Sequence, residues 1–241
     1  MSARGAAEVE VFADLASLTR AAGERLVRLA AERVERAGRF TVALAGGNTP
    51  RPLYELLAGE LRARVPWEAT EVYFGDERCV PPDDVNSNYG TARRALLAHV
   101  PRAKVFRIEG ERPPEEGARD YDATLRVAFP DSLAPTFDLA LFGVGADGHT
   151  ASRFPGTAAL DETERWPVAV DAPKSAAPRL PRVSLTLPIL TRSRESWFLC
   201  AGADKRDVVG RVLGGRAPLL PAARVRGALR TLWLLDRAAA G

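Results

Sequence analysis

Short apolar runs that alternate with amphipathic helical segments are the feature that most constrains how this sequence can fold. The runs suit strands that are buried on both faces of a sheet, and they cover residues 40–45, 71–74, 137–142, 197–200 and 232–235. Apolar side chains at helical spacing predict helices over residues 14–37, 52–57 and 89–97 and over a segment that ends at 213. Such alternation is typical of an α/β domain whose mostly parallel sheet is covered by helices, and we predict that fold class.

Length and composition favour one globular domain. The chain has 241 residues, 46% hydrophobic and 27% charged, which suits a single domain over residues 1–241. Residues 1–15 mix charged and small side chains without an apolar run, so we expect no signal peptide. No run approaches the roughly 20 apolar residues that a membrane span needs. Because the chain has only two cysteines, Cys79 and Cys200, we expect a cytoplasmic protein.

The basic residues only slightly outnumber the acidic ones, and they are dispersed. The formal net charge is +3, from 34 Lys and Arg against 31 Asp and Glu. Only Lys104, Lys174 and Lys205 are lysines, so arginine supplies most of the positive charge. A nucleic-acid site needs basic side chains that are clustered as well as numerous. We therefore expect no nucleic-acid partner.

The loop after the first predicted strand is rich in glycine. Gly46, Gly47, Asn48 and Thr49 separate that strand from a predicted helix. Glycines let the backbone approach a ligand closely, and free amides before a helix favour an anion. The same residues could instead form a tight turn without a ligand. The loop matches neither the Walker A motif nor G-x-G-x-x-G, so nucleotide binding is not indicated.

Charged residues follow the second predicted strand. Asp76, Glu77 and Arg78 come directly after Gly75, and ligands of open parallel sheets bind beyond the carboxyl ends of the strands. Arg78 could hold a phosphate through two N–H groups or stabilise an oxyanion. Ion pairs within the segment could equally do no more than shape the turn.

The segment after the third predicted strand, residues 143–149, is the most informative. Its sequence GVGADGH places His149 after three glycines and Asp147. A neutral imidazole can take a proton from water, and a neighbouring carboxylate can fix its tautomer. The other histidine, His99, comes late in a predicted helix, and we expect it at the surface. His149 is therefore the candidate base.

Lys205 follows the fourth predicted strand at the start of a helix. Most such lysines are solvated, but a lysine in an arginine-dominated chain is a candidate for binding an anion. A G-x-S-x-G nucleophile elbow is absent from the sequence, and the histidines and cysteines are too far apart for a usual zinc site. We therefore expect neither a serine hydrolase nor a metal site.

Five segments together resemble the 6-phosphogluconolactonases, within the broader group that includes glucosamine-6-phosphate deaminases. They cover nearly the whole chain in order and spacing: 44–57 (LAGGNTPRPLYELL), 72–97 (VYFGDERCVPPDDVNSNYGTARRALL), 137–156 (FDLALFGVGADGHTASRFPG), 181–190 (PRVSLTLPIL) and 201–213 (AGADKRDVVGRVL). The resemblance implies a three-layer α/β/α Rossmann-like domain. It also implies hydrolysis of 6-phospho-D-glucono-1,5-lactone in the oxidative pentose phosphate pathway, without a cofactor. The expected partner is that small-molecule lactone, and we expect a monomer.

The resemblance also implies roles for individual residues. His149 would be the general base that activates water, with Asp147 orienting it. Lys205, Arg78 and the loop of residues 46–49 would hold the phosphate and polarise the lactone.

Three further residues complete the site that the resemblance implies. Asp76 would contact the substrate, and Arg182, which matches a family arginine before a strand, would line the pocket. Arg153 stands where the family usually carries Leu or Ile. It is expected either to add a phosphate contact or to point to solvent.

Two alternatives to a lactonase are considered. A glucosamine-6-phosphate deaminase would share the scaffold, but its second motif resembles MDEY rather than the DER of residues 76–78, and its third continues differently after DGH. A sugar-phosphate-sensing module of a transcription regulator is the other. The single predicted domain leaves no room for a helix-turn-helix beside it.

Overall fold

The computed structural model describes residues 7–130, 133–174 and 176–241. The expectation of a start without a signal peptide rests partly on residues 1–6, which lie outside these ranges. The strands are β1 (Glu8–Phe12), β2 (Phe40–Leu44), β3 (Thr70–Phe74), β4 (Asp76–Arg78), β5 (Lys104–Val105), β6 (Leu139–Phe142), β7 (Pro167–Val170), β8 (Arg182–Leu185), β9 (Glu195–Cys200) and β10 (Arg230–Asp236).

The α-helices range from one turn to six turns in length. They are α1 (Leu15–Ala37), α2 (Arg51–Ala58), α3 (Asn88–Ala95), α4 (Pro114–Ala128), α5 (Leu187–Leu190), α6 (Arg206–Leu213), α7 (Pro221–Arg224) and α8 (Arg237–Ala240). The 3₁₀ helices are η1 (Arg62–Arg64), η2 (Trp67–Ala69), η3 (Leu97–His99), η4 (Ala158–Asp161) and η5 (Ala203–Lys205). As predicted, α1 ends where Gly38 follows it.

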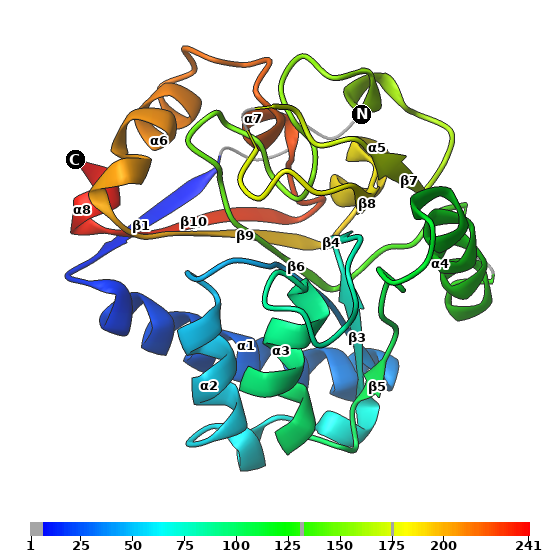
Figure 1. Ribbon diagram of the computed structural model, residues 1–241. Helices are drawn as coiled ribbons and strands as arrows, with labels where there is room; N and C mark the ends of the chain where they lie inside the picture. The colour runs from blue at the N-terminus through cyan, green and yellow to red at the C-terminus, as the bar shows by residue number, and fades with distance from the viewer. Residues whose placement is uncertain (1–6, 131–132, 175) are drawn as a thin grey trace.

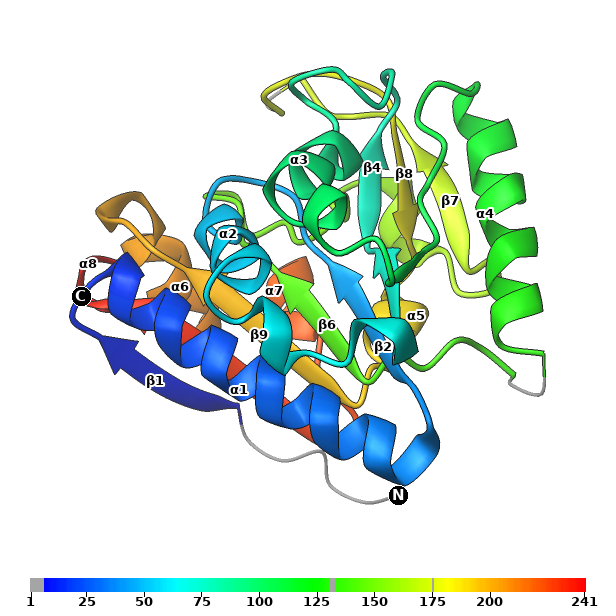
Figure 2. The same ribbon diagram turned by 90° about the horizontal axis from the view of Figure 1, so that it is seen from below.

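Seven strands form a parallel sheet in the order β1-β10-β9-β6-β2-β3-β5. From β2 the chain adds β3 and β5 on one side, then returns to the other side of β2 with β6, β9 and β10. The strand order therefore reverses between β2 and β6, which lie side by side in Figure 2. Ligands of such sheets bind at the carboxyl ends of the strands beside this switch point.

Helices cover both faces of the parallel sheet. In Figure 1, α1, α2 and α3 lie on one face, and α6 and α7 lie on the other. The predicted α/β class, with a mostly parallel sheet between two helical layers, is confirmed.

The strands are apolar because the sheet is buried on both faces. Every residue of β2, β3 and β6 is buried. From β9 and β10, Trp197 and Trp233 are among the largest fully buried side chains, and the rings of Phe198 and Trp233 stack with centroids 4.2 Å apart. Helix α1 covers the sheet with apolar residues at helical spacing, Leu18, Ala22, Leu26 and Ala30. Burial on both faces explains the continuous apolar runs in the sequence.

A second sheet of three antiparallel strands, β4-β8-β7, was not predicted. Gly75 joins the two sheets: its N–H donates to Leu44 O of β2 at 3.2 Å, and its carbonyl accepts from Leu185 N of β8 at 2.9 Å. The segment expected to be a loop after β3 is therefore itself strand β4. Arg182, expected before a strand, is the first residue of β8. Helix α4 packs against β7 and β8 (Figures 1 and 2).

Some element boundaries also differ from the prediction. Strand β6 begins at Leu139 rather than 137. The side chain of Asp138, just before it, accepts hydrogen bonds from the Thr41 N–H and hydroxyl, both at 2.9 Å. Helix α3 ends at Ala95, and the chain continues as η3. Strand β1 pairs in parallel with β10 at the edge of the sheet and was not predicted. Among the described residues, no helix combines the length and apolarity needed to cross a membrane.

Candidate active site

A cleft of about 440 Å³ opens at the carboxyl ends of the parallel strands. Its walls are the segments that follow β2, β3, β6 and β9, together with residues of the small sheet and of α3. It therefore lies at the β2–β6 switch point, where the strand order predicts a ligand site. Residues of the predicted site that lie far apart in the sequence meet in this cleft, among them Thr49, Arg78, His149, Arg182 and Lys205.

The loop after β2 forms one wall of the cleft. Gly46, Gly47, Asn48 and Thr49 all line it, directly before α2. A Cβ on Gly46 would lie 1.8 Å from Asn88 Oδ1, so this position accepts no side chain while Asn88 stays in place. The close approach between the two residues fixes this loop against the start of α3.

Two arginines lie opposite each other across the small sheet. Arg78 of β4 pairs with Arg182 of β8 in the antiparallel register, and both line the cleft. The Arg78 Nη1 donates to Asn86 O at 2.6 Å and the Arg182 Nη2 to Pro178 O at 3.0 Å, while both Nε atoms have no protein partner among the described residues. Like charges directly opposite one another are unfavourable in a sheet. An anion between them would remove that repulsion.

The surroundings of Arg182 favour an anion further. Burial lowers the pKa of Arg182 below its ordinary value, Asp76 opposes this shift, and the positive charge of Arg78 adds to it. A bound anion would oppose the lowering of this pKa, because its negative charge stabilises the charged guanidinium.

Asp76 connects three parts of the site from a buried position. Its Oδ2 accepts from the Ser152 hydroxyl at 2.5 Å, and its Oδ1 accepts from Asn88 Nδ2 at 3.1 Å. The same Asn88 amide donates to the main-chain oxygen of Asp76 at 2.9 Å. Asp76 thus ties the segment that carries His149 to β4 and to α3.

The candidate base and its acidic neighbour are in contact. His149 Nδ1 lies 2.6 Å from Asp147 Oδ1, which also accepts the His149 main-chain N–H at 3.0 Å. Burial opposes ionisation of Asp147, but the hydrogen bonds from His149 outweigh it and hold the pKa of the carboxyl below its usual value. An ionised Asp147 makes Nδ1 the protonated nitrogen of a neutral ring, so Nε2 carries the free lone pair. This is the arrangement that a general base needs.

Gly145 and Phe154 hold the imidazole in place from two sides. A Cβ on Gly145 would lie 2.1 Å from His149 Nδ1 and 2.7 Å from Asp147 Oδ1, so only glycine leaves room for the pair. The ring of Phe154 lies 4.7 Å from the imidazole, between centroids. The side chain of His149 stays 31% exposed, which leaves it accessible to water.

Lys205 brings a further positive charge to the cleft from the end of η5. Its Nζ lies 3.0 Å from Asp204 Oδ2, and its side chain is 25% exposed. Because Asp204 is largely exposed, this ion pair contributes little to stability. Lys205 therefore remains available to bind an anion in the cleft.

Comparison with known proteins assigns the chain to a family. A sequence model of the family described as glucosamine-6-phosphate isomerases/6-phosphogluconolactonase matches residues 13–233. The chain belongs to this family. Among named relatives, the 6-phosphogluconolactonase of Mycobacterium tuberculosis is 39% identical, with 96% of each chain covered. The rat protein of that name is 38% identical, with 90% of this chain and 88% of its own covered.

Solved structures of the family agree with this assignment. The 6-phosphogluconolactonase of Trypanosoma brucei superposes with a TM-score of 0.86 at 30% identity, covering 99% of this chain and 98% of its own. The 6-phosphogluconolactonase of Thermotoga maritima superposes with a TM-score of 0.84 at 29% identity, and the match covers 96% of this chain and 100% of its own. A monomeric glucosamine-6-phosphate deaminase gives 0.79, but at 20% identity it shows a common fold alone.

Most of the site residues predicted for a member of this family gather at the cleft. Nine of them line it, namely Gly46, Gly47, Asn48, Thr49, Asp76, Arg78, His149, Arg182 and Lys205. Asp147 contacts His149 from outside the lining. His99 is exposed, as expected.

Arg153 departs from both of its predicted positions. Its side chain neither points to solvent nor lines the cleft: the residue is fully buried, and its Nη1 donates to Ala159 O at 2.7 Å. Burial lowers the pKa of Arg153 to about 10, although Asp76 and Glu162 oppose the shift. The expectation that Arg153 points to solvent is therefore wrong, while a phosphate contact at this position stays a prediction that the buried side chain does not favour.

Asn88 was not predicted as a site residue, although it lines the cleft and binds Asp76. In the sequence it stands beside Ser87, which does cap α3 by accepting from Gly90 N at 2.8 Å. The pattern Asn-Ser-Asn before a helix indicates a cap and gives no sign of a second role. Within the described part of the chain, no three His, Cys, Asp or Glu side chains cluster as metal ligands would.

Proposed function

We propose that this member of the family is a 6-phosphogluconolactonase, which hydrolyses 6-phospho-D-glucono-1,5-lactone to 6-phospho-D-gluconate in the oxidative pentose phosphate pathway. The observation that carries the proposal is that His149, paired with Asp147, lines the same cleft as the Arg78–Arg182 pair. The first pair suits activation of water, and the second suits an anionic substrate. The relatives named above bear the name of this activity.

The proposed reaction begins with general base catalysis. His149 Nε2 accepts a proton from water as the water oxygen bonds to C1 of the lactone, and Asp147 stabilises the imidazolium that forms. The bond between C1 and the ring oxygen then breaks, and the imidazolium returns its proton to that oxygen, which leaves as the C5 hydroxyl. A lactone is an activated ester, so a base that contributes roughly 10²–10⁴-fold, together with oxyanion donors, is sufficient without a covalent intermediate.

The phosphate is proposed to bind the positive side chains of the cleft. Arg78, Arg182 and Lys205 supply charged donors, and residues 46–49 supply amides and the Thr49 hydroxyl. Asp76 is proposed to orient the sugar, since the residue lines the cleft. Each charge-assisted hydrogen bond to a phosphate contributes roughly 1.5–3 kcal/mol.

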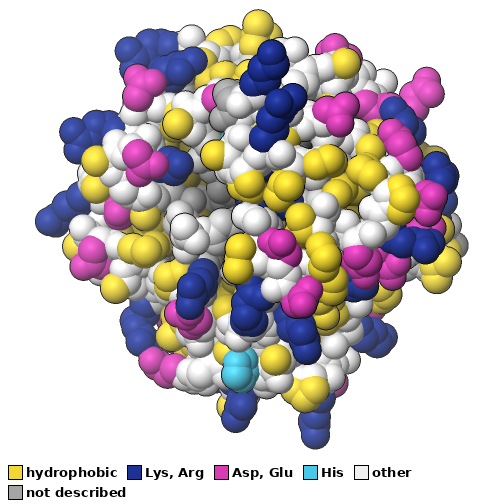
Figure 3. All heavy atoms as spheres, in the orientation of Figure 1, with side chains coloured by type: hydrophobic (Ala, Val, Ile, Leu, Met, Phe, Trp, Pro, Cys, Tyr) yellow, Lys and Arg dark blue, Asp and Glu magenta, His cyan; other side chains and the backbone are white. Residues whose placement is uncertain are grey.

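The wider setting of the enzyme is also a proposal. We expect one domain over residues 1–241, a monomer in the cytoplasm, no metal or cofactor in the reaction, and no nucleic-acid partner. On the face shown in Figure 3, Lys and Arg side chains are interspersed with Asp and Glu rather than gathered in one patch, which supports the last point.

The test compares two reactions on the same purified protein. Hydrolysis of 6-phosphogluconolactone should exceed its spontaneous rate by many fold, and no ammonia should be released from glucosamine 6-phosphate. Ammonia release without lactone hydrolysis would instead identify a deaminase.

A further inference from the structure

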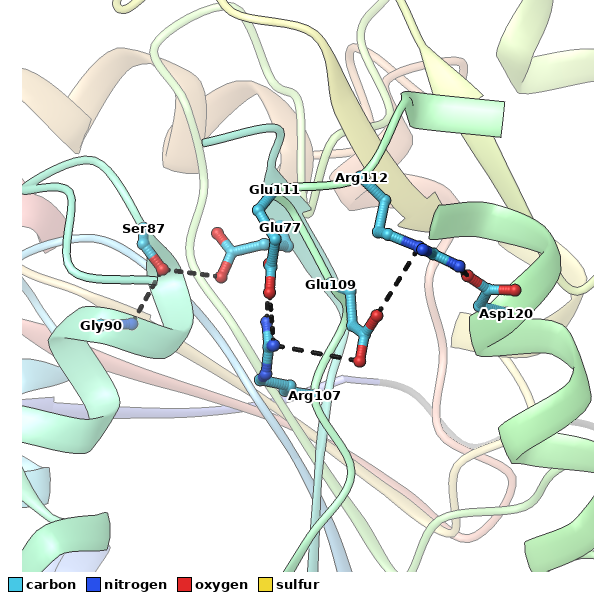
Figure 4. A network of polar contacts seen from close by, with 8 residues as sticks. All are labelled: Glu77, Ser87, Gly90, Arg107, Glu109, Glu111, Arg112 and Asp120. Atoms are coloured by element: carbon cyan, nitrogen blue, oxygen red, sulfur yellow. Dashed lines mark hydrogen bonds and ion pairs between the residues drawn. The ribbon is translucent and has the colours of Figure 1, made fainter. Parts of the chain in front are cut away.

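Glu77 is a buried carboxylate that the proposed reaction does not use. It lies in β4 between Asp76 and Arg78, is 2% exposed, and does not line the cleft. Figure 4 shows its side chain reaching from β4 to Ser87 at the start of α3. A buried carboxylate is costly unless its oxygens are hydrogen-bonded, so its partners indicate what it does.

Both oxygens of Glu77 are saturated with donors. Oε1 accepts the main-chain N–H groups of Arg78 and Asn88, each at 2.7 Å. Oε2 accepts the main-chain N–H of Tyr89 at 2.7 Å and the hydroxyl of Ser87 at 3.0 Å. One side chain therefore binds both the strand that carries Arg78 and the first turn of α3.

The two residues held by Oε1 both line the cleft. Arg78 faces it from β4, and Asn88 lies against Gly46 of the glycine-rich loop and donates to Asp76. The position of the Glu77 carboxylate thus sets the separation between Arg78 and Asn88. Through Asn88 it also sets the place of the loop after β2.

The turn that contains Gly110 packs against β4 outside the cleft. A Cβ on Gly110 would lie 2.4 Å from Arg78 O and 3.2 Å from Glu77 Cγ, so the turn packs directly on β4. Arg107 holds this turn by pairing with Glu111 at 2.5 Å, as Figure 4 shows, and its guanidinium lies 5.3 Å from the centre of the Tyr89 ring. Glu77 is therefore enclosed on the side away from the cleft.

Glu77 is not placed to exchange protons with a substrate. All its strong acceptor positions are occupied, and the residue is closed off from the cleft. Burial raises the pKa of Glu77, while the N–H groups of Tyr89, Asn88 and Arg78 oppose the shift. Its geometry suits holding other groups in place.

We propose that Glu77 is a positioning residue, which fixes Arg78 and Asn88 at the cleft by accepting both of their main-chain N–H groups on Oε1. The proposal concerns the site of the proposed lactonase and rests on that function for its kinetic readout. It makes the shape of the side chain, rather than its charge, the property that activity requires.

Two substitutions separate shape from charge. Glu77→Gln removes the charge, but its amide oxygen can occupy the Oε1 position and keep the Arg78 and Asn88 contacts. Its NH₂ group can donate to the Ser87 hydroxyl but opposes the Tyr89 N–H, which loses its acceptor, so Tm should fall. Glu77→Asp keeps the charge, but the carboxylate is one methylene shorter and cannot reach all four donors. We expect kcat/KM to stay within about threefold of wild type in the first and to fall roughly tenfold or more in the second, since small displacements of site groups are costly.

Ser87→Ala is the matched control. It removes one Oε2 donor and the cap of α3, so it should lower Tm, but it leaves the Oε1 contacts intact and should leave kcat/KM within about threefold. A role in stability alone would lower Tm in all three variants and leave kcat/KM unchanged in all of them, which would overturn the proposal. A loss in Glu77→Gln as large as that in Glu77→Asp, with the Arg78 and Asn88 amides still protected from exchange, would also overturn it, because activity would then require more than the two Oε1 contacts.

Amide hydrogen exchange provides a readout that needs no substrate. In Glu77→Gln the Arg78 and Asn88 amides should stay protected while the Tyr89 amide exchanges faster, and in Glu77→Asp the first two should also exchange faster. Unchanged exchange at Arg78 and Asn88 in Glu77→Asp would contradict the proposal even if the wild-type protein lacked lactonase activity. If Glu77→Asp does not fold, the Glu77→Gln variant alone tests the proposal. Faster exchange of the Arg78 or Asn88 amide in that variant, with kcat/KM retained, would overturn the proposal.

Discussion

His149 is the residue on which the proposed chemistry depends most directly. Its Nδ1 is held by Asp147 at 2.6 Å, which leaves Nε2 to take the proton from water. Replacing His149 with Ala should lower kcat by roughly 10²-fold or more and change KM much less, because a base acts mainly in the transition state. Steady-state kinetics of the purified variant on the phosphorylated lactone measure both constants.

The stability of the His149→Ala protein is the control for this prediction. The side chain is partly exposed, so Tm should change little. Activity within a few-fold of wild type in the folded variant would show that another group activates the water. Asp147 would then be the next candidate, since its carboxylate is only 2.6 Å from the imidazole.

Among the elements of the fold, the loop after β6 contributes the most closely packed part of the site. Gly145→Ala places a methyl group 2.1 Å from His149 Nδ1 and 2.7 Å from Asp147 Oδ1, so the pair must move. A displacement of about 1 Å can cost roughly 10²-fold in rate, and we expect a loss of kcat of that order. Kinetics with the phosphorylated lactone provide the measurement.

Gly210→Ala in α6 is the matched control for the loop variant. Its added methyl group would meet only Arg216 Nη2, at 3.7 Å, and alanine favours a helix. This protein should keep wild-type kcat and lose no stability. If Gly145→Ala were as active as Gly210→Ala, the loop would be able to shift without disturbing the base.

The elements that the sequence predicted are those whose signal is local. Strands buried on both faces require apolar side chains in succession, so β2, β3, β6, β9 and β10 were visible as apolar runs. The small sheet was not visible, because β4 has the sequence Asp-Glu-Arg and depends on pairing with Arg182–Leu185, more than a hundred residues away. Strand β1 alternates Glu and Val at the sheet edge and lacks such a run.

The sequence also predicted which segments meet at the candidate site, but not the distances between their side chains. Residues 143–149 and Arg78 follow strands of a parallel sheet, which brings them to one edge. Distances such as that between Asn88 and Gly46 depend on how α3 packs, and spacing along the chain does not encode them. Arg153 shows the same limit, because the spacing along the chain does not reveal that its buried side chain donates to Ala159 O of η4.

At the scale of the whole molecule, the fold brings three separate groups that can bind an anion to one cleft. The parallel strands direct the loop of residues 46–49 and η5 with Lys205 to the same edge, and Gly75 turns the chain so that β4 adds Arg78. Their combined binding energy comes from a part of the substrate that does not react. Such remote binding can position the lactone against His149, so its loss should lower kcat as well as weaken binding.

Comparison of phosphorylated and plain gluconolactone tests this convergence. Three charge-assisted hydrogen bonds of roughly 1.5–3 kcal/mol each, at about 1.4 kcal/mol per tenfold, make the plain lactone worse by roughly three or more decades in kcat/KM. Lys205→Ala and Arg78→Ala should each reduce turnover of the phosphorylated lactone far more than that of the plain one, because only the former offers them a dianion. The measurement is kcat/KM for both substrates in wild type and both variants.

Equal losses on the two substrates would mean that Lys205 and Arg78 support the fold or the oxyanion. The phosphate would then have to bind nearer Arg182, whose Nε has no protein partner among the described residues.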